Sequence, residues 1–552
     1  MALDQSLGFG RILPAALRGP LDAVTRGLAN LTQRPAIDIT APTYAMAFAA
    51  VILAGAALQF AIYHAGLYSI SADESARAIF AHNLTFDNAF ELTFWTPLNK
   101  IMNGLALKIH DDLYVTPRIL TGLLGLATIG AVMMLANRLF ENRLVAVIAG
   151  VLALALPQRL ILSVAPLSDM QAFFLTLFGT AFLVTWFRKG SVGDLLIACV
   201  MLLLASMVRF ESWFLNALLG LYLAYRALIK RDLAFVPFVI AGALISVFPL
   251  YWLAKIYILD GSLARLGMTT MQFTDTYGRS YVQAFKSDAL VLYIKDMLTS
   301  PAVLFGTLGV TLVALKDAKV RPVILLVFAP LFILGVMMVA TLSVPLAAPF
   351  RIDGMWVLLA MPFAAWLIVT AADHLRTSTM VRVFAVLVLA YIGFMASLIE
   401  THDTVKGYYA NANDLIVKED LVMGDKLRDI LAHDPRNIMV DAIDNLSFLN
   451  AAAVANAPER MIANVDADLV ITGIYSTSRP KYEADPDKTI LDTYMTDKFN
   501  ILGGLDPAQL QARNIGYLLM RNANYIAACD QNPLLEKLGT YGAWVLYEVK
   551  QS

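Results

Sequence analysis

Long apolar blocks, separated by short polar segments, divide roughly the first 400 residues of this 552-residue chain. A helix needs about 20 mostly apolar residues to cross the hydrocarbon core of a bilayer. About eleven blocks are predicted as spans, at 44–63, 119–135, 144–160, 170–187, 195–207, 213–228, 233–253, 301–315, 323–342, 356–372 and 383–398. Backbone polar groups in lipid must be satisfied within the segment, so these spans should be helices. The predicted fold class is therefore a polytopic α-helical membrane protein.

Lysine and arginine in the short loops predict the orientation of these spans, because such residues concentrate on the cytoplasmic side. With a cytoplasmic amino terminus, every second loop is basic; these loops contain Arg138 and Arg143, Arg188 and Lys189, Arg226, Lys230 and Arg231, Lys316, Lys319 and Arg321, and Arg376 and Arg382. An odd number of spans places the carboxyl terminus outside. The loops at about 69–118 and 254–300, and everything after residue 400, are expected to be extracytoplasmic.

Three parts follow from this division. Residues 1–43 form a cytoplasmic segment, either an amphipathic helix on the membrane surface or a disordered tail. Residues 44–400 form the bundle. From 401 to 552 the chain gains Asp, Asn, Lys and Pro and loses its long apolar runs, which indicates an α/β domain. Its expected buried strands are 437–440, 469–472, 516–520 and 543–547, with helical patterns between them.

Composition argues against several kinds of site. The net charge is −1, so no general attraction to nucleic acid is expected. The two cysteines, Cys199 and Cys529, form neither a disulfide framework nor a zinc-binding spacing, so no metal site and no cofactor are predicted. Dependence on a divalent metal stays open. No Gly-rich phosphate loop follows a predicted strand, which is consistent with a donor other than a nucleotide.

An acidic pair, Asp73 and Glu74, opens the first extracytoplasmic loop. The pattern Ser71-x-x-Glu74 is typical of a capping box, in which Glu74 reaches back over the start of a helix. Glu74 therefore has either a structural role or a role in binding substrate. A carboxylate at the position of Asp73 is favoured by the helix dipole. Asp73 is also expected at the membrane–water boundary, either as a solvated first-turn acid or as the base of an enzyme.

Further charged residues lie at the outer ends of the spans. Asp169 stands at the edge of the fourth span, where an unpaired carboxylate is costly and usually functional. It is expected either to orient an acceptor or to pair with Arg209. Arginines on the same side are candidates for binding phosphate, because the guanidinium fork matches phosphate oxygens. The alternative for each is an interfacial or ion-paired arginine. These candidates are Arg118, Arg209, Arg265, Arg279 and Arg351.

The order of these elements resembles that of the GT-C superfamily of glycosyltransferases, which use polyprenyl-phosphate sugars. A first span is followed by an Asp-Glu pair opening a surface helix, by an aromatic-Thr-Pro-Leu stretch, and by an arginine at the start of the second span. In this chain these are Asp73-Glu74, Phe94-Trp95-Thr96-Pro97-Leu98 and Arg118. The resemblance covers about residues 44–400.

The similarity extends to the branch that contains protein O-mannosyltransferases and the lipid A aminoarabinose transferase. Ser168-Asp169-Met170, Arg209-Phe210-Glu211 and Arg351 resemble further charged positions of that branch. Thr96-Pro97 departs from it, because members often have Lys or Glu with a Pro-Pro pair there. Lys100 lies nearby but out of register, and no phosphate-binding role is transferred to it. These departures leave the sugar and the acceptor open.

The resemblance implies an enzyme that moves a sugar, with inversion, from a polyprenyl-phosphate donor to a lipid, glycan or protein acceptor. It would act among membrane lipids at the outer face of a membrane, expected to be the bacterial inner membrane. Asp73 is predicted as the general base, because an acceptor hydroxyl is too weak an acid to attack unaided. The residues predicted to bind substrate are Glu74, Arg118, Asp169, Arg209, Glu211 and Arg351.

Two other functions stay open. A transporter or flippase of a lipid-linked sugar usually has sequence repeats and ionisable residues at mid-membrane, whereas the charges here cluster at the outer face. A scaffold acting through its α/β domain would not need about eleven spans as an anchor.

Overall fold

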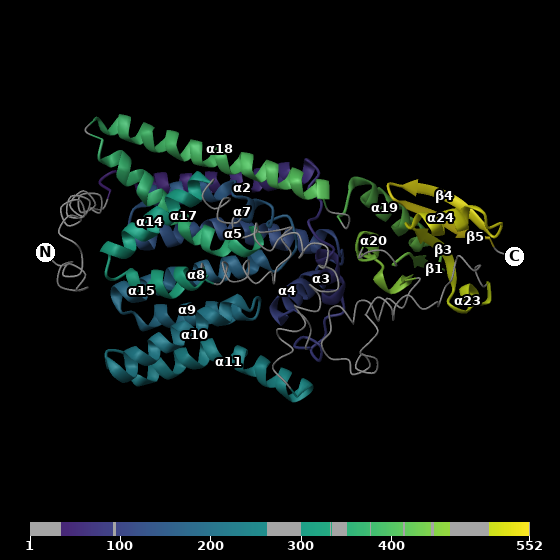
Figure 1. Cartoon of the computed structure of the whole chain (residues 1–552), viewed down its shortest axis with the longest axis horizontal. Helices are drawn as coiled ribbons and strands as arrows, with labels where there is room; N and C mark the ends of the chain where they lie inside the picture. The colour runs from purple at the N-terminus through teal and green to yellow at the C-terminus, as the bar shows by residue number, and fades with distance from the viewer. Residues whose placement is uncertain are drawn as a thin grey trace, which may run out of the picture.

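The structure, a computed structural model, describes residues 35–91, 95–261, 300–331, 333, 350–375, 377–411, 415–442, 447–463 and 507–550. A helical bundle occupies most of the length of the molecule, and a small α/β domain stands at one end of it (Figure 1). Residues 1–34 of the predicted amino-terminal segment, most of the second predicted outer loop and most of the second half of the predicted span 323–342 lie outside the described residues.

Seven helices of the described chain are long and apolar enough to cross a membrane. They are α2 (Ala41–His64), α5 (Val115–Phe140), α8 (Asp169–Lys189), α10 (Glu211–Ala224) with its π-helical continuation η2 (Tyr225–Ile229), α11 (Phe235–Asp260), α17 (Phe350–Asp373) and α18 (Thr379–Asn411). Four shorter apolar helices occupy the other predicted spans. They are α6 (Arg143–Leu154), α9 (Val192–Ser206), α14 (Pro301–Lys316) and α15 (Arg321–Val323), which η3 (Ile324–Phe328) continues. The predicted polytopic helical class is confirmed.

Burial separates the central helix of the bundle from the peripheral ones. In α17, 94 % of the apolar stretch is buried, whereas the corresponding share is 17 % for α2 and 22 % for α11 and α18. In a water-soluble protein such exposed apolar faces would be unstable, so these three helices present their outer faces to lipid. The core of the bundle is therefore built around α17.

The third predicted span, 144–160, is not one helix. α6 ends at Leu154, and Pro157 begins the separate short helix α7 (Pro157–Leu160). Proline lacks the N–H group that would continue the hydrogen-bond ladder. The fully buried Arg159 donates to the carbonyl oxygens of Leu154 (3.0 Å) and Gly125 (3.4 Å), and so satisfies backbone groups at the break. The hydropathy pattern was continuous here because it does not register a backbone break.

Two short helices occupy the end of the bundle that faces the α/β domain (Figure 1). They are α3 (Asp73–His82) and α4 (Pro97–Leu107), and both fall in the first predicted outer loop. Pro97 at the first position of α4 favours a helix start, because its fixed φ suits the first turn and its missing N–H costs nothing there. The predicted helix after the acidic pair is thus present, but six of its ten residues are buried, so it is not a surface helix.

The α/β domain contains a five-stranded sheet in the order β2-β1-β3-β5-β4. β1 is parallel to β2 and β3, whereas β5 is antiparallel to β3 and β4. The strands are β1 (Asn437–Val440), β2 (Met461–Ala463), β3 (Ile515–Met520), β4 (Leu535–Tyr541) and β5 (Trp544–Val549). The helices and turns are α19 (Lys418–His433), α20 (Ser447–Ala455), η4 (Pro458–Arg460), α23 (Pro507–Ala512) and α24 (Ala523–Asp530).

Three of the four predicted strands coincide with β1, β3 and β5, and the fourth, 469–472, lies outside the described residues. β2 and β4 were not predicted. β2 has only three residues, and β4 is an edge strand with mostly exposed side chains, so neither has a buried apolar run. The predicted domain start at residue 401 falls inside α18, which continues to Asn411 because the polar residues there remain helical.

Candidate active site

Asp73 is the first residue of α3, so the acidic pair opens this helix as expected, but the N-cap is Ala72 and not the predicted Ser71. Its backbone N–H donates to Ser71 Oγ at 3.2 Å, and its side chain is half-buried. One turn further along the same helix stands Arg77, whose charge interacts with that of Asp73. Residues four apart lie on one helix face. A carboxylate and a guanidinium group therefore lie on the same face of α3, at the end of the bundle.

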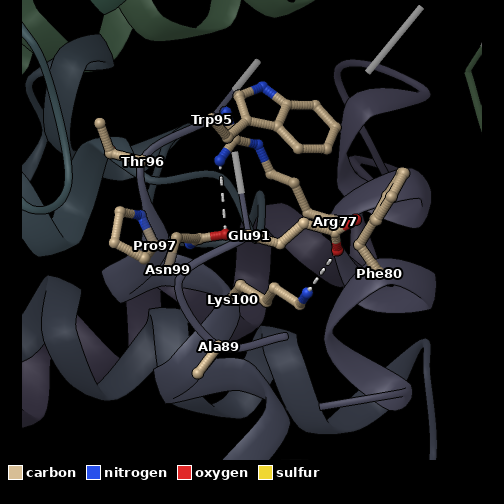
Figure 2. A pocket seen from close by; sticks show the side chains of 9 residues that line it. All are labelled: Arg77, Phe80, Ala89, Glu91, Trp95, Thr96, Pro97, Asn99 and Lys100. Carbon is tan, nitrogen blue, oxygen red and sulfur yellow. Dashed lines mark hydrogen bonds and ion pairs between the residues drawn. The ribbon is translucent and has the colours of Figure 1, made fainter. Parts of the chain in front are cut away.

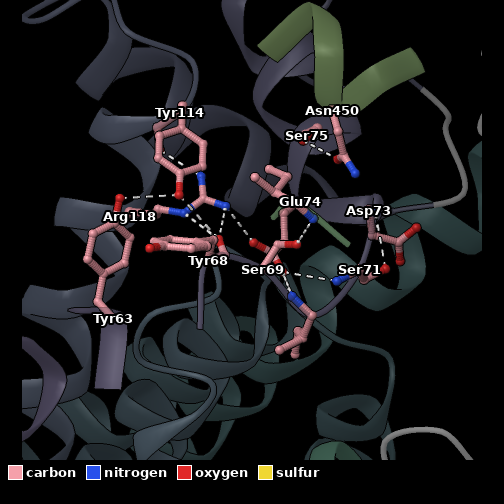
Figure 3. Close-up of polar contacts among 12 residues, drawn as sticks. Tyr63, Tyr68, Ser69, Ser71, Asp73, Glu74, Ser75, Tyr114, Arg118 and Asn450 are labelled. Carbon is pink, nitrogen blue, oxygen red and sulfur yellow. Dashed lines mark hydrogen bonds and ion pairs between the residues drawn. The ribbon is translucent and has the colours of Figure 1, made fainter. Parts of the chain in front are cut away.

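Glu74 is buried and its carboxylate is held by internal contacts (Figure 3). Oε1 accepts hydrogen bonds from the N–H groups of Ile70 (2.6 Å) and Ser71 (3.1 Å), and Oε2 pairs with Arg118 at 2.9 Å. The predicted capping box is half present: the Glu74 side chain accepts hydrogen bonds from the backbone before the helix. The second hydrogen bond differs, because Ser71 Oγ accepts from the N–H of Asp73 rather than from that of Glu74. These contacts give Glu74 a structural role, and its predicted contact with substrate stays a prediction.

Arg118, at the start of α5, fastens the loop that leads into α3. Its guanidinium donates to the carbonyl oxygens of Tyr68 (2.9 Å) and Tyr114 (2.7 Å) in addition to Glu74. It also lies 3.7 Å from the centre of the Tyr114 ring. Its fork is therefore occupied by protein groups, and the predicted phosphate-binding role of Arg118 stays a prediction.

Burial raises the pKa of Glu74 to about 7, although Arg118 and the N–H groups of Ile70 and Ser71 act in the opposite direction. The folded protein thus binds this proton more tightly than the unfolded chain does. The contribution of Glu74 to stability is therefore fully present below about pH 4.5 and is lost as the pH rises to about 7.

The variant Glu74→Gln should remove this dependence, because an amide does not titrate. Between about pH 4.5 and 7.5, the free energy of unfolding of the wild type should fall relative to that of the variant by up to about 3 kcal/mol. Unfolding of the detergent-solubilised protein across this range measures the difference. The exposed Glu536→Gln is the control. A difference between wild type and Glu74→Gln that stays constant with pH would contradict the assignment.

A second charged cluster joins three segments of the bundle. Asp169, fully buried at the start of α8, pairs with Arg209 and, at 3.3 Å, with Arg351 of α17. Arg209 also pairs with Glu211, the first residue of α10. The pairing of Asp169 with Arg209, one of the two predicted alternatives, is present. The predicted roles of these four residues in substrate binding stay predictions.

Arg77 is the functional candidate that the sequence reasoning missed. It is only 6 % exposed, donates to Asn99 Oδ1 at 3.4 Å, and lies over the Trp95 ring at 4.2 Å. Asn99 in turn donates to Gln171 of α8 at 3.2 Å. Burial lowers the pKa of Arg77 to about 10, so it is charged at neutral pH. Its spacing of four residues from Asp73 was the available signal.

A pocket opens beside Arg77, between α3, the loop after it and the start of α4 (Figure 2). Trp95, Thr96, Asn99 and Lys100 line it together with Arg77. Lys100 Nζ donates to the carbonyl oxygen of Asn88 at 2.8 Å and lies 3.6 Å from Glu91. The fold thus brings Lys100, to which the sequence assigned no role, and Arg77 to the same pocket.

Some predicted candidates lie outside the described residues, namely Phe94, Arg265 and Arg279. Among the residues that the structure describes, no three His, Cys, Asp or Glu side chains lie close enough together to hold a metal ion.

The chain has the GT-C fold, with a bundle of apolar helices, the helix α3 at one end of it and an α/β domain after it. No family model and no curated protein matches the sequence. Among solved structures, ArnT from Cupriavidus metallidurans in the apo state is similar with a TM-score of 0.51 and 14 % identity, over 92 % of this chain and 98 % of that one. The Archaeoglobus fulgidus oligosaccharyltransferase tethered with an acceptor peptide gives a TM-score of 0.51 and 13 % identity, over 89 % and 71 %. The predicted GT-C fold is confirmed.

Proposed function

We propose that this protein is a membrane glycosyltransferase that moves a sugar from a polyprenyl-phosphate donor to an acceptor, with inversion and with Asp73 as general base. The observation that carries the proposal is the face of α3, where Asp73 stands one turn before the buried Arg77, which lines a pocket. Transfer from a lipid phosphate needs a base for the acceptor and a cation for the leaving group. This face offers both.

In the proposed step, the acceptor hydroxyl gives its proton to the Asp73 carboxylate as its oxygen bonds to the anomeric carbon. The bond from that carbon to the phosphate oxygen breaks, and the electron pair leaves with the phosphate. Attack from the side opposite the phosphate inverts the anomeric centre. A positioned base is worth about 10²–10⁴-fold in rate.

Arg77 and Lys100 are the cations proposed for the departing phosphate, since both line the pocket next to α3. Preorganised cations stabilise the charge that develops on a leaving group without reorganisation at the moment of reaction. The cluster of Asp169, Arg209 and Arg351 would hold the spans behind this pocket. Its arginines, like Arg118, remain proposed substrate contacts rather than established ones.

The proposed orientation follows from the basic loops: the amino terminus is cytoplasmic and the α/β domain extracytoplasmic. The proposed membrane is a bacterial inner membrane. The site then lies at the outer membrane surface, where a polyprenyl-phosphate sugar presents its anomeric carbon. The proposed acceptor is a lipid, a glycan or a protein. The similar Archaeoglobus fulgidus oligosaccharyltransferase was solved tethered with an acceptor peptide.

The direct test incubates the purified protein with a panel of synthetic polyprenyl-phosphate sugars and measures the release of polyprenyl phosphate. Release that depends on an added acceptor is the expected result. If no donor is consumed while reconstituted protein moves a labelled donor across the bilayer, the protein is a transporter and the proposal is wrong.

Replacing Arg77 with glutamine should weaken the reaction by about 10–100-fold in kcat/KM, which is what the loss of a charged hydrogen bond of about 1.5–3 kcal/mol produces. Arg77→Lys should recover part of this loss because it keeps the charge. Steady-state kinetics with varied donor measures the effect. Arg226→Gln, which breaks an ion pair with Asp232 at the other end of the bundle, is the matched control. Equal kinetics for Arg77→Gln and wild type would remove Arg77 from the site.

A further inference from the structure

Helix α3 is held on one side by the C-terminal domain. Ser75 Oγ donates to Asn450 Oδ1 of α20 at 2.7 Å, and both side chains are 3 % exposed (Figure 3). The next residue, Ala76, is fully buried in a cluster with Ile416 and Phe448. A buried hydrogen bond and an apolar contact therefore join α3 to a segment about 375 residues further along the chain.

The loop before α3 is fixed by the end of the last span. Tyr409 Oη accepts a hydrogen bond from the N–H of Tyr68 (3.0 Å) and donates to the carbonyl oxygen of Ser69 (2.9 Å). The N–H of Ile416 donates to Ser69 Oγ at 2.6 Å. With Arg118 on the other side, the backbone that enters α3 is bonded to both halves of the protein.

The segment between α4 and α5 is docked on the same domain. Asn456 exchanges hydrogen bonds with the carbonyl oxygen of Asp111 (2.9 Å) and the N–H of Leu113 (2.8 Å). Arg428 of α19 pairs with Asp112 at 2.9 Å. Asp112 also accepts from the N–H of Val115 at the start of α5 (2.7 Å). The domain therefore contacts the chain on both sides of α3 as well as α3 itself.

The direction of these contacts along α3 is informative. Successive helical residues turn by about 100°, so a side chain two positions away points to the opposite face. Ser75 lies two positions from both Asp73 and Arg77. Asn450 therefore holds the back of the helix whose front carries the proposed base and the proposed phosphate ligand.

We infer that the C-terminal domain is a structural part of the active site, and that Asn450 and Tyr409 are positioning residues that act on the reaction through α3. The inference rests on the proposed function. A displacement of about 1 Å of a catalytic group can cost on the order of 10²-fold in rate. Loss of either contact therefore acts on the chemical step without removing any group that touches substrate.

The test compares Asn450→Ala, which removes the acceptor of the Ser75 hydrogen bond, with Asn450→Asp, which keeps an acceptor oxygen. Tyr409→Phe removes one hydroxyl group and is the alternative test variant if Asn450→Ala does not fold. Asn437→Ala, which loses a hydrogen bond to the Arg513 carbonyl inside the domain, is the matched control. Hydrogen exchange of the α3 amides in the full-length protein, and kcat and KM for the donor, are measured for each.

For Asn450→Ala and Tyr409→Phe we expect α3 amides to exchange about tenfold faster or more, with α8 and α17 unchanged. The value of kcat should fall about 10–100-fold while KM stays within about twofold, and Asn450→Asp should restore much of it. Unchanged exchange in α3 would overturn the inference, and so would faster exchange with wild-type kcat. If the wild type transfers no sugar, the proposed function fails, and the exchange rates alone then decide whether the domain holds α3.

Discussion

Replacing Asp73 with asparagine is expected to lower kcat for sugar transfer by about 10²–10⁴-fold. The asparagine side chain keeps the size of the carboxylate and its hydrogen-bonding capacity, but it does not accept the acceptor proton at neutral pH. Because Asp73 lies at the end of α3 and is half-buried, the change should leave the fold and donor binding intact. Kinetics with a synthetic donor, together with a direct donor-binding measurement, separate the two effects.

The control for this variant is Asp87→Asn. Asp87 is an exposed carboxylate in the loop after α3, so it has the same charge as Asp73 but lies elsewhere. It should transfer sugar at the wild-type rate. If Asp73→Asn does so too, Asp73 is not the base. If Asp73→Asn loses donor binding in parallel with turnover, the residue binds substrate rather than abstracting a proton.

The largest effect on stability is expected for Asp169→Ala. The carboxylate is fully buried and shared by Arg209 and Arg351. Removing one partner of a buried ion pair costs about 3–5 kcal/mol, because the remaining charges stay in a medium that solvates them poorly. Glu211 still neutralises Arg209, so the effect should come mainly from Arg351. Thermal unfolding in detergent should show a clear fall in the midpoint.

The exposed pair of Lys426 and Asp429 on α19 provides the comparison. Exposed pairs contribute little, so Asp429→Ala should unfold close to the wild type. Adding Arg351→Met to Asp169→Ala should recover part of the lost stability, since the uncompensated charge is then removed. Equal midpoints for Asp169→Ala and wild type would show that the three-residue cluster is not a support of the bundle.

The spans were predictable because a helix that crosses a bilayer must be long and apolar, and such stretches can be recognised in the sequence alone. The same reasoning failed at Pro157, where the apolar block continues while the backbone breaks. It also ended the last span at residue 398, whereas α18 continues to Asn411, because hydropathy detects the end of the apolar segment and not the end of the helix. Apolar composition thus predicts which segments lie in the membrane, but not where each helix ends.

In the candidate site, too, some residues could be predicted from the sequence and others could not. Asp73, Asp169 and Arg209 were found because charged residues next to apolar spans are conspicuous in a sequence. Arg77 was not found, since its signal in the sequence was only the spacing of four residues from Asp73, whereas its contacts with Trp95 and Asn99 appear only in the folded chain. Asn450 had no local signal at all, because its partner Ser75 is brought to it only by the tertiary fold.

The contact between Ser75 and Asn450 also sets an order of events during synthesis. A separation of 375 residues, at about 5–20 residues per second, corresponds to roughly 20–75 seconds of translation. During that time the early spans can insert, but α3 lacks the partner that covers its back. A chain released before residue 450 would carry Asp73 and Arg77 without a fixed distance between them and the membrane. The back of α3 is therefore covered only after residue 450 has been synthesised.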